Sequence, residues 1–288
     1  MTTFIFLHGS FHGAWNWHRV LPHLERAGHR GIALDLPGHG RNPMKPSKVT
    51  LKTCVDHVLS VMDAAPTSGG IVLVAHSRNG IVISQTAEAR PGRLRGLVYL
   101  AAYLVPNGRS MMEYAIDDPD SLVVQNVEAG LSPKAIRLLT RLFRSGLLRG
   151  IGAALLPRAM QEHRLKRAAY CEALYHDCGP EIVELANALL EPEPNWAGFE
   201  PLRITPDRFG RVPKAYIECL RDRAVTLPLQ RRMLHDTPCD RVFSMDTSHS
   251  PFFSQPERLA GLLLQAVEGF GGVGHLAEIA SPAAVAAS

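Results

Sequence analysis

Six short apolar runs, separated by segments with helical periodicity, set the strongest limit on how this chain can fold. Each run has the length and uniform apolar character of a strand that is buried on both faces. The predicted strands span residues 3–8, 31–35, 71–76, 96–101, 214–219 and 241–245. The predicted helices around them span residues 15–28, 51–65, 79–89, 227–235 and 255–269. This alternation indicates an α/β fold with a mostly parallel six-stranded sheet, flanked by helices and connected by right-handed crossovers.

The alternation is interrupted over residues 104–212, where the sequence favours helices throughout. We therefore expect a helical cap over 104–212, inserted into a core made of residues 1–103 and 213–270. Within the cap, apolar residues from Ile136 to Phe143 alternate with arginines at helical spacing, which predicts an amphipathic basic helix. An exposed arginine face over a cap core is favoured over a lid or a membrane contact. Residues 271–288 form a weakly patterned tail to which we assign no catalytic role.

The predicted strand 71–76 runs directly into Ser77 and then into a helical pattern. A serine on such a sharp turn has its hydroxyl exposed above the sheet, as in the nucleophile elbow G-x-S-x-G. Here Ala75 and Asn79 occupy the two glycine positions. Alanine adds only a methyl group, and asparagine tolerates unusual backbone angles, so we expect the turn to survive these changes.

An acid and a histidine follow two later strands, in the order serine, acid, histidine. Asp222 follows the strand 214–219, with Glu218 and Asp246 as alternatives, and His249 follows the strand 241–245. In such a triad the histidine takes the proton of the serine and the carboxylate orients the imidazole.

Two backbone N–H groups are predicted to bind the oxyanion, those of Ser10 in the glycine-containing loop after the first strand and of Arg78 after the nucleophile. For the Arg78 side chain, solvent exposure or a structural ion pair is favoured over contact with an anionic substrate. His76, beside the nucleophile, is predicted to be structural, since alternation along the strand directs it to the opposite side from its neighbours.

These segments resemble the α/β-hydrolase superfamily, in the branch that holds plant methyl esterases, hydroxynitrile lyases and bacterial esterases of the pyrethroid-hydrolase kind. The resemblance rests on His-Gly-Ser-Phe-His-Gly-Ala-Trp (8–15), Asp-Leu-Pro-Gly-His-Gly (35–40), the elbow, and the segment 248–259. It implies the α/β-hydrolase fold and places a cap where the insertion 104–212 lies. The lyases carry a lysine after the catalytic histidine and a threonine in the first loop, where this chain has Ser250 and Gly9, and this counts against lyase activity.

Composition agrees with an enzyme of this size. The 288 residues are 46% hydrophobic, and the formal net charge is only +4, so nothing favours a nucleic-acid partner. The five cysteines show no C-x-x-C spacing, which argues against zinc or a disulfide framework. We expect no cofactor and no metal, no membrane span, and a cytoplasmic location because no signal peptide is apparent. A homodimer is left open.

The sequence thus predicts a serine hydrolase that cleaves a carboxylic ester of a small or aromatic apolar substrate. Amide or carbon–carbon bond hydrolysis, lyase activity and a non-catalytic ligand receptor are the alternatives, because the same triad or fold supports them. The candidate substrate-binding residues come from the first loop and the cap: Phe11, His12, Met111, Met112, Phe143, Tyr170 and Trp196, with Tyr114 and Leu139 as further wall candidates.

Overall fold

A six-stranded parallel sheet forms the centre of the computed structural model, which describes residues 1–66, 69–128, 131–145 and 161–271. Its strands are β1 (Thr3–Leu7), β2 (Arg30–Leu34), β3 (Ile71–His76), β4 (Leu94–Leu100), β8 (Lys214–Cys219) and β9 (Arg241–Met245). They lie in the order β2-β1-β3-β4-β8-β9, and every neighbouring pair is parallel. The predicted fold class is confirmed, and each predicted strand corresponds to one of the observed six.

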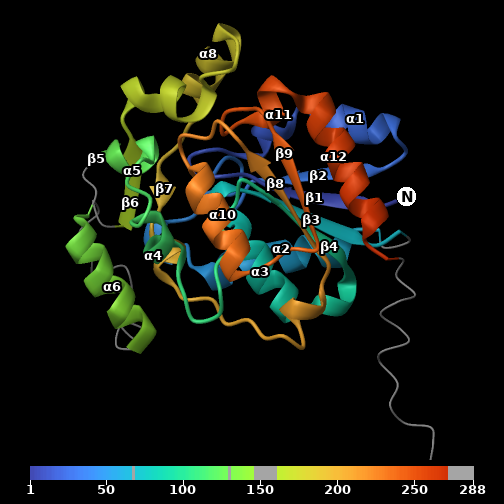
Figure 1. Ribbon diagram of the computed structural model, residues 1–288, viewed down its shortest axis with the longest axis horizontal. Coiled ribbons are helices and arrows are strands. Elements are labelled where there is room, and N and C mark those ends of the chain that lie inside the picture. The colour runs from blue at the N-terminus through green and yellow to red at the C-terminus, as the bar shows by residue number, and fades with distance from the viewer. Residues whose placement is uncertain (67–68, 129–130, 146–160, 272–288) are drawn as a thin grey trace, which may run out of the picture.

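Helices cover both faces of the sheet, with α1, α11 and α12 on one face and α2, α3 and α10 on the other (Figure 1). These helices are α1 (Leu21–Arg26), α2 (Leu51–Ala64), α3 (Gly80–Ala89), α10 (Leu227–Asp236), α11 (Pro251–Ser254) and α12 (Pro256–Gly269). Short 3-10 helices are η1 (Ala14–Trp17), η2 (Pro46–Lys48), η3 (Ser77–Asn79), η4 (Pro91–Arg93) and η8 (Phe209–Arg211). The predicted helix 15–28 is divided into η1 and α1, with a proline in the first turn of α1, a position that suits proline.

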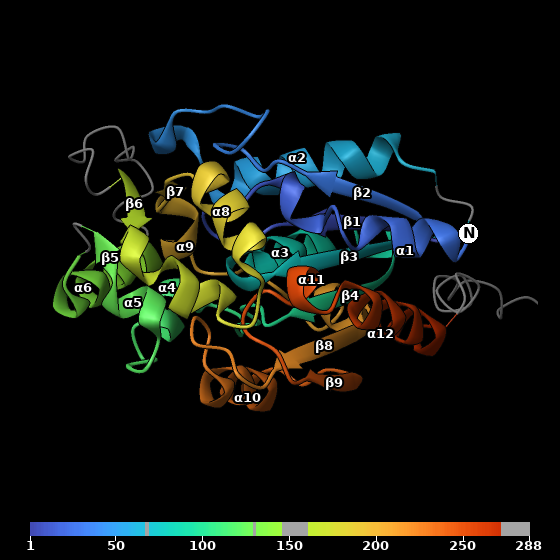
Figure 2. The same ribbon diagram turned by 90° about the horizontal axis from the view of Figure 1, so that it is seen from above.

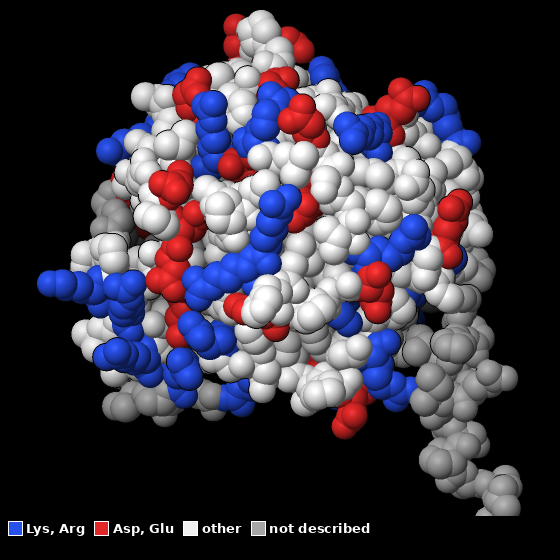
Figure 3. Space-filling model, in the orientation of Figure 1, with Lys and Arg blue, Asp and Glu red and all other residues white. Residues whose placement is uncertain are grey.

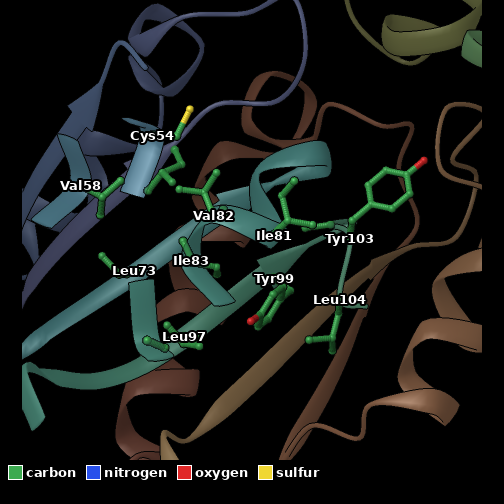
Figure 4. Close-up of a cluster of buried hydrophobic side chains, with 14 of the residues drawn as sticks. Cys54, Val58, Leu73, Ile81, Val82, Ile83, Leu97, Tyr99, Tyr103 and Leu104 are labelled. Carbon is green, nitrogen blue, oxygen red and sulfur yellow. The ribbon is translucent and has the colours of Figure 1, made fainter. Parts of the chain in front are cut away.

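The two-residue period of the strands divides the core into two layers. In β1, Ile5 and Leu7 join the cluster on the side of α2 and α3, whereas Phe4 and Phe6 join the cluster on the side of α12. Figure 4 shows part of the first layer, where side chains of α2 and α3 pack against those of β3 and β4. Strands buried on both faces in this way read as continuous apolar runs, which is why the sequence reveals them.

The segment 104–212 leaves the sheet after β4 and returns to it at the neighbouring strand β8. Figures 1 and 2 both place its elements α4, α5, α6, β5 and β6 beyond one end of the sheet, whereas η8, near its end, packs against α3. It contains α4 (Met111–Ala115), α5 (Leu122–Gln125), β5 (Val127–Glu128), α6 (Pro133–Ser145), β6 (Glu162–Leu165), η6 (Arg167–Ala169), the π-helix η7 (Cys171–Tyr175), α8 (Pro180–Leu189), β7 (Glu193–Pro194) and α9 (Trp196–Phe199). We call this segment the cap.

The expectation of helices throughout the cap is wrong, because β5, β6 and β7 form a small three-stranded antiparallel sheet. Strands of two to four residues are too short to show a period in the sequence. Their pairing joins segments far apart along the chain, as in the pair of His163 with Glu193.

The basic helix α6 has the predicted two faces. Ile136 and Phe143 are buried against Phe199, while Arg137 and Arg144 form exposed ion pairs with Asp117 and Glu113. On the face of the molecule in Figure 3, basic and acidic side chains are interspersed. In the part of the chain that the structure describes, no helix is long and apolar enough to cross a membrane. The tail from residue 272 onward lies outside the described residues.

Candidate active site

Ser77 lies on the turn between β3 and α3 with a positive φ of 55°. This is the left-handed region, which is costly for a residue other than glycine and is common at functional sites. The Ser77 carbonyl accepts a hydrogen bond of 2.9 Å from the Tyr103 amide, which follows β4. The segment that follows the neighbouring strand therefore holds the strained turn in place.

The two departures from the glycine pattern are accommodated differently. Ala75 is fully buried within β3, and Asn79 places its side-chain amide 2.5 Å from the carbonyl oxygen of His8. Close backbone approach occurs one residue later, since a Cβ at Gly80 would lie 2.4 Å from the Tyr103 carbonyl oxygen. Asn79 thus joins the elbow to the first loop by a hydrogen bond that glycine could not form.

Asp222 and His249 follow β8 and β9, neighbours in the sheet, and their side chains meet. His249 Nδ1 lies 2.6 Å from Asp222 Oδ2, and both side chains are buried. Asp222 Oδ1 also accepts the backbone N–H groups of Ala224 and Val225 at 2.7 and 2.9 Å. A carboxylate held on both oxygens in this way can fix the orientation of the imidazole.

The alternative acids have other partners. Glu218 accepts hydrogen bonds from Arg231 and Ser244, and Asp246 pairs with Arg221. Asp222 is therefore the acid that the structure places against His249.

Ser77 and His249 line one cavity of about 270 Å³, together with Ser10 and Arg78. Asp222 lies behind His249 and does not reach the cavity wall. No hydrogen-bond acceptor for the Ser10 amide is found among the described residues. The structure thus brings the predicted nucleophile, the histidine and both residues predicted to supply the oxyanion donors to one cavity.

Four of the seven predicted substrate-binding residues line this cavity, namely Phe11, His12, Met111 and Met112. Phe143, Tyr170 and Trp196 do not. Phe143 and Trp196 instead pack edge to face with ring centroids 4.5 Å apart, and Tyr170 packs against the core. The further candidates Tyr114 and Leu139 are also absent from the wall.

Most of the wall comes from the cap, and many of these residues are aliphatic side chains that the sequence does not indicate as wall candidates. They are Ala115, Ile116, Val123, Val124, Val127, Leu131, Pro133, Ile136 and Leu174, accompanied by Phe199, His163 and Asn195. Nothing in the local sequence distinguishes a wall aliphatic from a core aliphatic, so only the three-dimensional arrangement reveals them. The resulting wall is mainly apolar.

A buried ion pair joins the elbow to the cap. The guanidinium of Arg78 lies 2.8 Å from Glu193 Oε1, with both side chains about 4% exposed. His39 Nε2 lies 3.3 Å from the other carboxylate oxygen. Burial by itself would raise the pKa of the Glu193 carboxyl, but the charges of Arg78 and His39 lower it well below its usual value. Arg78 is therefore engaged in a structural ion pair, as favoured from the sequence.

Four buried histidines in and around the candidate active site have lowered pKa values. Burial lowers the pKa of His8 to about 3 and those of His12 and His163 to about 4. His76 is fully buried, and its pKa is also lowered by burial. Its Nε2–H donates to the His249 carbonyl at 2.8 Å, and the two rings lie 4.3 Å apart. His76 therefore supports the backbone and the ring of His249.

No group of three or more histidine, cysteine, aspartate or glutamate side chains suited to a metal ion is found within the described residues.

Comparison with known proteins gives matches along nearly the whole chain. Residues 4–262 match a family model described as the alpha/beta hydrolase family. Methylesterase 7 of Arabidopsis thaliana is 30% identical over 270 residues, covering 91% of this chain and 95% of that protein. Putative methylesterase 11, chloroplastic, from the same plant is 26% identical over 264 residues, but the chain spans only 63% of its length.

A solved structure shares the fold. The pyrethroid hydrolase from Sphingobium faniae JZ-2 superposes with a TM-score of 0.73 at 23% identity, covering 93% of this chain and 98% of that chain. Together with the family match, this confirms the resemblance that the motifs predicted.

Proposed function

Because the chain belongs to the alpha/beta hydrolase family, we propose that it is a carboxylic ester hydrolase that uses Ser77, His249 and Asp222 as its catalytic triad. One observation carries this proposal. Ser77, on a strained turn, and His249, with Asp222 2.6 Å behind it, line the same cavity. The methylesterase relatives support ester hydrolysis as the reaction.

The proposed reaction follows from this geometry. His249 takes the proton of the Ser77 hydroxyl as the oxygen attacks the ester carbonyl, and Asp222 stabilises the imidazolium that forms. The backbone N–H groups of Ser10 and Arg78 donate to the oxyanion. His249 then protonates the leaving alcohol, and water, activated by the same histidine, releases the acid from the acyl-enzyme.

The cavity supports a small or aromatic apolar substrate without a negative charge. Its walls are mainly aliphatic, and its volume of about 270 Å³ is limited. The guanidinium of Arg78 is occupied by Glu193, so it is unavailable to pair with a carboxylate of the substrate. We therefore propose neutral short-chain and aryl esters as the substrate class.

The test is hydrolysis of a panel of short-chain and aryl esters by the wild-type protein, Ser77→Ala and Asp222→Asn. We expect turnover that vanishes in Ser77→Ala. In Asp222→Asn we expect kcat to fall by on the order of 10⁴-fold, because the imidazole loses its orienting carboxylate. Hydrolysis that persists in Ser77→Ala would overturn the role of Ser77. Absence of turnover on every ester would favour an amide or carbon–carbon substrate, a lyase, or a ligand receptor.

A further inference from the structure

One cap residue, Glu193, contacts three loops of the core at the candidate active site. Its carboxylate accepts the Phe11 backbone N–H at 3.0 Å, pairs with Arg78 at 2.8 Å and with His39 at 3.3 Å. Phe11 belongs to the loop after β1, Arg78 to the elbow, and His39 to the turn after β2. The Glu193 side chain is 4% exposed, so water does not replace these contacts.

Two of these contacts reach residues that carry or adjoin the backbone groups proposed to bind the oxyanion. Arg78 provides one of the proposed N–H donors, and its side chain is fixed by Glu193. Phe11 directly follows Ser10, the other proposed donor, and Phe11 has a positive φ of 68°. A non-glycine residue keeps such a conformation only when its surroundings enforce it. The hydrogen bond to Glu193 is one such constraint.

The loop around Ser10 is held on both sides of this residue. The peptide that follows it has its N–H bound by Glu193 and its carbonyl bound by His12 Nδ1 at 2.7 Å. The peptide that precedes it, which carries the Ser10 N–H, has its carbonyl at Gly9 bound by His8 Nδ1 at 2.8 Å. Of these three hydrogen bonds, the bonds from His8 and His12 come from the loop itself, and the bond to Glu193 comes from the cap.

We propose that Glu193 is a positioning residue that sets both oxyanion donors, through Phe11 on one side and through Arg78 on the other. The inference rests on the proposed function, in which the Ser10 and Arg78 N–H groups stabilise the tetrahedral intermediate. The carboxylate does not reach the substrate itself, since Glu193 is absent from the cavity wall. Its effect is on the transition state, where a donor displaced by about 1 Å can cost roughly 10²-fold in rate.

The test compares Glu193→Gln with Glu200→Gln on the best aryl ester. Glutamine keeps the shape and an oxygen for the Phe11 N–H, but removes the charge that holds Arg78. Glu200 is a matched control, because it is also a cap glutamate that accepts a core backbone N–H, that of Leu51 at 2.7 Å, and it lies outside the cavity wall. Titration with a covalent organophosphate counts the competent sites, so that kcat is expressed per active site.

For Glu193→Gln we expect kcat to fall by roughly 10²-fold with KM changed by less than about 3-fold. Inhibition by an aryl boronic acid, which forms a tetrahedral adduct on serine, should weaken by a similar factor. Glu200→Gln should keep both values near those of the wild type. The double variant Glu193→Gln with Arg78→Gln removes both charges, so it avoids an unpaired buried charge, and it should still show the lowered kcat and the weakened boronate.

A wild-type kcat per active site in Glu193→Gln would overturn the inference, as would a loss that only lowers the number of competent sites. Equal losses in Glu193→Gln and Glu200→Gln would overturn it too, because both would then report general cap stability. Failure of the proposed function looks different, since it appears in the wild type and Ser77→Ala alone, either as hydrolysis that survives Ser77→Ala or as no turnover of any ester by the wild type.

Discussion

Asn79 occupies a position where the elbow motif has glycine, and its side chain forms a hydrogen bond that glycine cannot form. It donates to the His8 carbonyl at 2.5 Å in a buried setting. Its φ of −78° is open to any residue, so the backbone does not demand glycine at this position. The hydrogen bond joins the turn at Ser77 to the loop that carries Ser10.

We expect Asn79→Ala and Asn79→Gly both to lower the free energy of unfolding by about 1 to 3 kcal/mol, because the buried His8 carbonyl loses its donor. Glycine should be the worse of the two, since it also gains backbone entropy in the unfolded chain. Urea denaturation of the three proteins measures this. An Asn79→Gly variant more stable than the wild type would show that the hydrogen bond contributes nothing.

The sequence predicts the candidate site residues that directly follow a strand, but it does not indicate those that lie elsewhere in the chain. Ser77, Asp222 and His249 each follow an apolar run, and a chain-order rule connects them. Glu193 has no such signal, because its contact with Phe11 spans 182 residues and its short strand shows no period. The sequence also predicts the aromatic cap residues Phe143 and Trp196 in the wall, but in the structure they pack against each other. Aromatic character alone does not separate a cap core from a cavity wall.

At the scale of elements, the strands were the most predictable part of the chain, because burial on both faces leaves an apolar run with clear ends. The helices were less so. The segment 15–28 has apolar residues at helical spacing, but the chain bends between η1 and α1. The pairs of β5 with β6 and of β6 with β7 depend on distant partners, and only the folded chain brings them together.

Two helical glycines offer a matched test of how tightly the elements pack. At Gly80, in the first turn of α3, a Cβ would lie 2.4 Å from the Tyr103 carbonyl oxygen, whereas at Gly261 in α12 nothing lies within 4 Å. We expect Gly80→Ala to destabilise the protein by about 1 to 3 kcal/mol through overpacking. Gly261→Ala should stabilise it by roughly 1 kcal/mol through helix propensity. Thermal unfolding of both variants gives the sign of each change in stability. Changes of the same sign would contradict the packing of α3 on the chain after β4.

At the scale of the whole molecule, buried histidines should make the fold sensitive to acid. The pKa values of His8, His12 and His163 lie at about 3, 4 and 4 in the folded protein, against about 6.5 in an unfolded chain. Between about pH 4 and 6.5 the unfolded state therefore binds protons that the folded state does not, and the free energy of unfolding falls as the pH falls. Each histidine contributes a slope of about 1.4 kcal/mol per pH unit.

Urea denaturation at pH 7, 6 and 5 measures that slope. In His12→Gln one of the three groups is absent, so its slope should be smaller than that of the wild type by about 1.4 kcal/mol per unit below pH 6.5. Its stability at pH 7 also changes, because hydrogen bonds to Ser10 and Tyr175 are altered, but the comparison concerns the slope alone. Identical slopes would show that His12 is protonated equally in both states.

Glu193 is not alone in its connection between the cap and the core. Asp118 accepts the Thr226 N–H at 3.0 Å on the loop that follows Asp222, and Asp177 accepts the Ser248 N–H at 2.8 Å beside His249. The loop after β1, the loop that follows Asp222 and the loop that carries His249 are therefore each bound by a cap carboxylate.

This arrangement limits what can be achieved by replacing the cap with the cap of a related protein. The aliphatic wall comes from the same segment as the three carboxylates, so a cap transplanted from a relative to alter substrate range would also replace the acceptors of the core loops. A chimera that keeps Asp118, Asp177 and Glu193 and exchanges only wall positions changes the cavity wall without removing the carboxylates that bind the core loops. In this chain the aliphatic wall of the cavity and the carboxylates that bind the core loops lie on one segment, so an exchange that alters only the wall has to treat those three acids as part of the core.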